Sequence, residues 1–167
     1  MGLARFIAKV FSQSPNGSSG SPAEAPHLEL GRRGERLAAR ALRRSGMKIL
    51  YRNFRPGHGG EIDLVCRDRD TLVFVEVKTR APGGIGRPAD AVDSGKEEAL
   101  MQGAQAWLRL LGNPGVPVRL DIVEVIVPAE GKPQITHSRD ALAFSGERDG
   151  GAYRSTAPSR GSDSARS

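Results

Sequence analysis

Cysteine is almost missing from this chain of 167 residues, in which Cys66 is the single instance. One thiol excludes an intramolecular disulfide and any zinc cluster built from several cysteines. The simplest role for Cys66 is that of a small buried apolar side chain. Such sparse cysteine is typical of a reducing compartment, and we expect a cytoplasmic protein.

Aromatic residues and long apolar runs are also scarce. Phe, Trp and Tyr make up 5% of the chain, which leaves little material for a second core, so we expect one domain. The apolar stretch MGLARFIAKVF is interrupted by Arg5 and Lys9 before it reaches the length of a signal-peptide core. We therefore expect no stable membrane association.

Serine, proline and glycine dominate both ends of the chain. Residues 12–27 read SQSPNGSSGSPAEAPH, and a similar composition returns from about residue 145. Such segments bury too little apolar surface to offset the entropy lost on ordering. The predicted organisation is a flexible extension over residues 1–28, a folded domain over 29–143 and a disordered tail over 144–167.

Positive charge exceeds negative charge, with a formal net charge of +6, and most of this excess lies between residues 29 and 143. A basic domain favours an acidic partner such as nucleic acid, although a basic surface also keeps many proteins soluble.

Apolar periodicity predicts two helices and four strands. LGRRGERLAARALRRSG and AVDSGKEEALMQGAQAWLRLLG have helical spacing and end near Gly46 and Gly112. MKILYRNFR, EIDLVCRD, TLVFVEVKTR and VRLDIVEVIV are typical of strands, and the second and third are close enough for an antiparallel hairpin. The predicted fold is an α/β sandwich with the order α-β-β-β-α-β, in which helices pack on a mixed sheet and the last strand runs parallel to the third.

Two charged residues, Glu76 and Lys78, interrupt the apolar alternation of the third strand. A two-residue loop at residues 69–70 would set Asp63 opposite Glu76 and Glu61 opposite Lys78, all on one face of the hairpin. Opposed Cβ atoms lie about 5 Å apart, so the Asp63 and Glu76 carboxylates can converge on one hard cation. The alternative is a solvated sheet face on which Lys78 pairs with an acid. The other face is apolar and suited to packing on a helix; it collects Ile62, Leu64, Cys66, Val73, Val75 and Val77.

These segments carry a resemblance. GEIDLVCRDRDTLVFVEVKTR, with the upstream GRRGERLAARALRRSGMKIL and YRNFR, resembles the YraN-like family of bacterial proteins over residues 31–127. That family is a branch of the PD-(D/E)XK nuclease superfamily, related to archaeal Holliday-junction resolvases. The resemblance implies a restriction-endonuclease-like fold and metal-dependent cleavage of phosphodiester bonds.

The resemblance also implies roles for individual residues. Asp63 and Glu76 match the two metal-binding acids, and Lys78 matches the lysine that orients or activates the attacking water. Glu35 matches a further acid that some relatives direct at the metal, although an acid near a helix N-terminus also complements the helix dipole. The expected cofactor is Mg²⁺ or Mn²⁺, because Mg²⁺ is usually held by one or two carboxylates together with water and phosphate oxygens.

Basic residues near these positions are candidates for binding the phosphates of a nucleic acid. They are Arg32, Arg33 and Arg36 in the first helix, Arg80 and Arg87 around the glycine-rich segment TRAPGGIGRP, and Lys96 at the start of the second helix. His58, in the bend before the second strand, is a weaker candidate for proton transfer.

Two functions remain open at this point. The first is a metal-dependent endonuclease that acts on DNA rather than RNA, including branched or structured DNA. The second is a nucleic-acid-binding module that has the same fold but no catalysis. By analogy with resolvases, a nuclease of this kind would act as a homodimer that cuts two strands.

Overall fold

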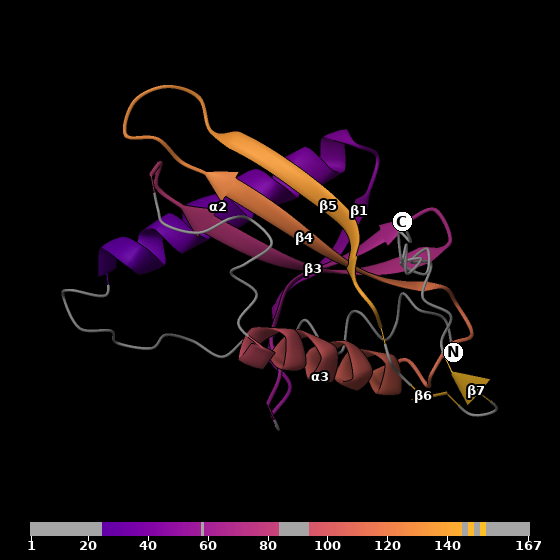
Figure 1. The fold of residues 1–167 in the computed structure, drawn as a ribbon. Helices are drawn as coiled ribbons and strands as arrows, with labels where there is room; N and C mark the ends of the chain where they lie inside the picture. Colours follow the sequence, from indigo (N-terminus) through magenta and orange to yellow (C-terminus); the bar gives the residue numbers. More distant parts are fainter. Residues whose placement is uncertain (1–24, 58, 84–93, 145–146, 149–150, 153–167) are drawn as a thin grey trace, which may run out of the picture.

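The computed structural model describes residues 25–57, 59–83, 94–144, 147–148 and 151–152. Over these residues the chain forms a five-stranded sheet with helix α2 (Ala25–Arg44) against one face and helix α3 (Ser94–Leu110) against the other (Figure 1). In spatial order the strands are β1 (Lys48–Phe54), β2 (Ile62–Asp68), β3 (Thr71–Arg80), β4 (Val118–Ile126) and β5 (Gln134–Leu142). A separate hairpin joins β6 (Glu147–Arg148) to β7 (Gly151–Ala152).

The sheet is mixed. β3 and β4 are parallel and are connected through α3, whereas the other neighbouring pairs are antiparallel. The predicted mixed α/β architecture with a parallel crossover is therefore confirmed. The prediction missed β5, which lies at the edge of the sheet. Its sequence QITHSRDAL has few apolar residues, in keeping with side chains that are all exposed or half-buried.

Each face of the sheet carries its own apolar cluster. The predicted apolar face packs on α2, where Leu64, Cys66, Val73 and Val75 are fully buried with Leu42 and its neighbours. The opposite face carries Val65, Leu72 and Phe74 beneath Leu100, Trp107 and Leu108 of α3. Both faces of the central strands are thus covered by a helix.

The placement of Ile62 was wrong in the prediction. Ile62 belongs to the α3 cluster instead of the α2 cluster. It lies beyond the last residue pair that joins β2 to β3 and pairs with Phe54 of β1. Because Gly103 of α3 has no side chain, the helix approaches so closely that a Cβ on Gly103 would lie 2.8 Å from Ile62 Cγ1.

The described elements extend beyond the predicted limits of the folded domain. α2 begins at Ala25, inside the stretch predicted to be a linker. At the other end, Phe144 is 5% exposed within the α3 cluster, and β6 and β7 lie in the segment predicted to be a tail. Within the described ranges, neither helix is long and apolar enough to cross a membrane.

Candidate functional site

A cleft of about 610 Å³ is lined by residues from the end of β3 and from the first turns of both helices. α2, β2, β3 and α3 all contribute to its walls. Its lining consists of His27, Leu30, Gly31, Glu35, Glu61, Asp63, Glu76, Val77, Lys78, Thr79, Lys96 and Ala99. Five of the residues predicted to act in catalysis or nucleic-acid binding therefore meet in one cavity: Glu35, Asp63, Glu76, Lys78 and Lys96.

The geometry of the β2–β3 hairpin explains how the two acids come to line this cleft. Asp68 pairs with Thr71 across residues 69–70, so the predicted two-residue loop is confirmed, and the predicted register holds as far as Leu64 and Val75 but not for the predicted Asp63–Glu76 and Glu61–Lys78 pairs. The paired ladder ends at Leu64 and Val75. Beyond it the backbone N–H of Val77 donates to Asp63 Oδ2 at 2.7 Å, where a regular ladder would use a backbone carbonyl. The strands part here, and the Asp63 and Glu76 side chains line the opening.

Burial and nearby carboxylates make both acids hard to ionise. Removal from water, with the negative charge of Glu76 as the next cause, raises the pKa of Asp63 to about 7, although the hydrogen bond from Val77 acts in the opposite sense. Burial also raises the pKa of Glu76, while the ammonium groups of Lys96 and Lys78 partly oppose that rise. The two carboxylates are therefore held together in a setting that favours added positive charge.

The charges that line the cleft do not balance. Four carboxylates, those of Glu35, Glu61, Asp63 and Glu76, face two ammonium groups, which leaves two excess negative charges when every group is ionised. A divalent cation would offset this excess, and carboxylate oxygens are the ligands that Mg²⁺ prefers. Within the part of the chain that the structure describes, no group of three or more His, Cys, Asp or Glu side chains is arranged to hold a metal ion. Asp63 and Glu76 both line the cleft, and two carboxylates completed by water or phosphate oxygens are a usual donor set for Mg²⁺.

Close packing of α2 on β3 brings Glu35 to the cleft. Gly34 is buried against Thr79, and a Cβ at residue 34 would lie 1.7 Å from Thr79 Oγ1 and 2.7 Å from Thr79 Cβ. Only glycine allows this approach, and the next residue along the helix is Glu35. The predicted acid of the first helix therefore reaches the same cavity as Asp63 and Glu76.

Glu61 has a partner that the sequence did not indicate. Its Oε1 accepts hydrogen bonds from Arg55, with the Nε of Arg55 at 2.9 Å. Arg55 lies just after β1, six residues earlier in the chain, and its side chain is 66% exposed. The segment YRNFR, which carries part of the resemblance, ends in Arg55, but its contact with Glu61 depends on how the bend between β1 and β2 folds back, which no local pattern indicates.

The arginines predicted for nucleic-acid binding occupy different settings. Arg32, Arg33 and Arg36 are exposed on α2, and Arg36 forms an ion pair with Glu29 at 3.3 Å. Arg80, at the end of β3, is half-buried and lies 3.6 Å from Glu124.

Glu124 of β4 was also missed by the prediction. It is 8% exposed and pairs in register with Lys78 on the neighbouring parallel strand. Two further candidates, Arg87 and His58, lie outside the described residues.

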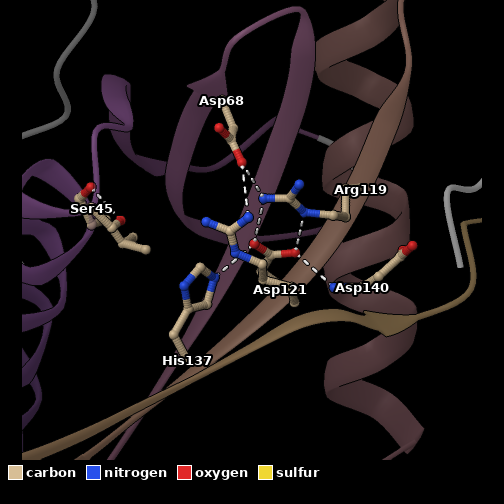
Figure 2. A network of polar contacts seen from close by, with 8 residues as sticks. Ser45, Asp68, Arg119, Asp121, His137 and Asp140 are labelled. Atoms are coloured by element: carbon tan, nitrogen blue, oxygen red, sulfur yellow. Dashed lines mark hydrogen bonds and ion pairs between the residues drawn. The ribbon is translucent and has the colours of Figure 1, made fainter.

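A second polar cluster lies away from the cleft, on the α2 side of β4 (Figure 2). Asp121 is completely buried and accepts hydrogen bonds from Arg119 Nε at 2.8 Å and the Asp140 backbone N–H at 2.9 Å, with His137 Nε2 also at 2.8 Å. Burial alone would raise the pKa of Asp121, but the bonds to His137, Arg119 and Asp140 together lower it. Arg119 also reaches Asp68 of β2 at 3.1 Å. The cluster therefore links β2, β4 and β5.

The sequence of this chain matches the model of a known protein family. The model of a family described as "Uncharacterised protein family UPF0102" matches residues 34–125, which is more than half of the chain. The chain belongs to the UPF0102 family. This is the YraN-like family that the sequence resembles, and the UPF0102 match includes every described residue that we predict to act in catalysis.

UPF0102 proteins from several bacterial genera are similar to much of this chain. A UPF0102 protein of Streptomyces coelicolor is 47% identical over 111 residues, which cover 66% of this chain and 85% of that protein. One from Rhodococcus jostii is 46% identical over 118 residues, covering 71% and 99%. One from Geobacter sulfurreducens is 45% identical over 113 residues, covering 68% and 88%.

Proposed function

We propose that this UPF0102 protein is a metal-dependent endonuclease that hydrolyses phosphodiester bonds in DNA, with a restriction-endonuclease-like fold of the PD-(D/E)XK superfamily. The observation that carries the proposal is the meeting of Asp63, Glu76 and Lys78 in a cleft with excess negative charge. A polyanionic substrate would be repelled by such a cleft unless a cation entered with it.

Asp63 and Glu76 would hold the cation, Mg²⁺ or Mn²⁺. When bound, it would polarise a phosphoryl oxygen and lower the pKa of a coordinated water. The raised pKa values of both acids support this assignment, because a site that opposes ionisation in the free protein gains most from added positive charge.

The other side chains of the cleft would act on the substrate and the attacking water. Lys78 lies two residues after Glu76 on the same strand face, so its ammonium group can orient the water and offset negative charge that develops on the phosphate. Lys96 lies on the opposite wall and can contact an adjacent phosphate. The exposed arginines of α2 would hold the nucleic-acid backbone outside the cleft.

The test is cleavage of labelled linear, single-stranded and four-way-junction DNA, and of the matching RNA, with Mg²⁺, Mn²⁺ or EDTA. We expect cleavage of DNA that needs the metal and that falls about 100-fold or more in Lys78→Ala, since one charge-stabilising group typically contributes that much. Lys48→Ala is the matched control, because Lys48 is an exposed lysine of β1 outside the cleft. Light scattering with and without junction DNA would test the homodimer that the resolvase analogy implies.

Failure to cut any substrate, with salt-sensitive binding intact, would favour the second function. Under that outcome the protein is a binding module, and Asp63→Asn and Glu76→Gln would leave its affinity for DNA unchanged.

A further inference from the structure

Arg55 is a cation beside the cleft that the proposed mechanism does not use, and it contacts Glu61, which lines the cleft. Its Nε and Nη2 both donate to Glu61 Oε1, and its guanidinium stays largely open to solvent. A guanidinium carries five N–H donors in a planar fork, so this single oxygen leaves donors for another acceptor.

The charged groups near Arg55 belong to the cleft. The hydrogen bond and charge of Glu61 are the main causes that raise the pKa of Arg55, and the carboxylates of Asp63 and Glu35 raise it further. The guanidinium therefore stands within electrostatic reach of three acids that line the cleft.

The acceptor of Arg55 is itself anchored. The backbone N–H of Glu61 donates to the carbonyl of Ala99 in α3 at 3.2 Å. Gly60 makes this contact possible, because it has a φ of 87° and a Cβ there would lie 2.6 Å from the backbone nitrogen of Gly103. The carboxylate of Glu61 thus extends from backbone that is fixed to the helix, and it holds Arg55 at a defined place on the rim.

The ion pair between Arg55 and Glu61 is expected to contribute little to the stability of the fold. Both side chains are well exposed, at 66% for Arg55 and 43% for Glu61, and exposed ion pairs add little to folding. Glu61 adds a negative charge beside Glu35, Asp63 and Glu76, which is unfavourable by itself, and orienting the Arg55 guanidinium toward a substrate would give that charge a function.

We propose that Arg55 binds a phosphate of the nucleic acid next to the one that is cut, and that Glu61 is its positioning residue. This inference rests on the proposed function, because it assumes that a nucleic-acid backbone crosses the cleft. A guanidinium is well suited to the role because its fork matches two phosphate oxygens.

The decisive measurement is the affinity for a labelled DNA duplex across a series of salt concentrations in EDTA, where metal-dependent cleavage cannot occur. The slope of log K against log salt falls by about 0.9 for each phosphate that a variant no longer binds. We expect Arg55→Gln to lower the slope by about this amount. Arg69→Gln should leave it unchanged, because Arg69 is an exposed arginine in the loop at the opposite end of β3.

Three outcomes of this experiment separate the roles. An unchanged slope in Arg55→Gln, together with a lower melting temperature, would overturn the inference and leave Arg55 as a structural partner of Glu61. An unchanged slope with tighter Mg²⁺ binding would also overturn it, and would mean that Arg55 only offsets the acids. A lowered slope in Arg55→Gln and a smaller reduction in Glu61→Gln would support it.

The same assays keep this inference distinct from the proposed function. Metal-dependent cleavage with no effect of Arg55→Gln on slope or KM overturns the role of Arg55 alone. A lowered slope in a protein that never cuts DNA overturns the nuclease while the phosphate contact stands. No salt-sensitive binding by the wild-type chain overturns both.

Discussion

Asp63 is placed where its ionisation is opposed by burial and by a neighbouring carboxylate, and it still keeps a hydrogen bond from Val77. An ionised carboxylate in such a place lowers the stability of the folded state. Groups with pKa values shifted in this way are frequent in functional sites. The same placement makes a prediction about stability and pH.

We expect Asp63→Asn to stabilise the protein at about pH 8 without divalent cations. The folded-state pKa of about 7 lies above the ordinary 3.8, so the folded chain holds this proton more tightly and loses stability as pH rises between the two values. At 1.36 kcal/mol per pKa unit the gain is at most about 4 kcal/mol, and partial exposure of Asp63 reduces it. Thermal unfolding at about pH 8 and about pH 4 measures the effect, which should nearly vanish at the lower pH.

Asp70→Asn is the control for this prediction, because Asp70 is exposed in the hairpin loop. Equal changes in melting temperature for the two variants at the higher pH would contradict the burial argument.

Asp121 is a buried acid of the opposite kind, since its hydrogen bonds more than offset the effect of burial and lower its pKa. We expect Asp121→Ala to cost about 3 kcal/mol or more in urea unfolding, because it leaves Arg119 and His137 without their buried partner. Asp68→Ala should cost clearly less, since Arg119 would keep Asp121. A larger loss of stability in Asp68→Ala than in Asp121→Ala would contradict this prediction. It would show that the contact between Arg119 and Asp68 stabilises the cluster more than the buried carboxylate of Asp121 does.

At the scale of elements, the contact between α2 and β3 depends on one glycine. Gly34→Ala forces the helix away from Thr79 and should cost about 1–3 kcal/mol, the usual range for overpacking. It should also lower any cleavage activity, because Glu35 moves with the helix. In a Thr79→Gly background the added loss from Gly34→Ala should become much smaller, since the space is restored.

Gly31→Ala is a matched control on the same helix. A Cβ at residue 31 meets nothing within 4 Å, so alanine should stabilise α2 by up to about 1 kcal/mol through helix propensity. Similar losses for both glycine substitutions would mean that packing on Thr79 is not what requires glycine at residue 34.

At the scale of the whole molecule, the apolar clusters draw on residues from Leu30 to Phe144. We expect a chain of residues 25–152 to unfold at about the same temperature as the full chain. A chain of residues 25–143, which keeps all of α2 and ends at the limit predicted from sequence, should be less stable by about 3 kcal/mol, a typical loss for a buried phenylalanine, because Phe144 is missing. Equal melting temperatures for the two shortened chains would show that Phe144 contributes little to the core.

Much of the site could be predicted because it depends on short-range rules. Strand alternation puts Glu76 and Lys78 on one face, and a two-residue loop sets a register that runs to the Leu64–Val75 pair and leaves Asp63 and Glu76 as the next residues on the two strands. These relations involve residues within about one hairpin, so the sequence alone determined them. It also determined the helix that carries Glu35 and the membership of the UPF0102 family.

The tertiary structure decided what depends on contacts between distant segments. β5 is too polar to be recognised alone and becomes a strand because β4 offers it an edge, with the Asp121 cluster tying the two together. Ile62 packs in the α3 cluster, and not in the predicted α2 cluster, because Gly103 lets α3 approach β2 closely. Arg55 contacts Glu61 because the bend between β1 and β2 folds back. No local period encodes such meetings, because the free energy that fixes them comes from packing whole helices and strands against one another.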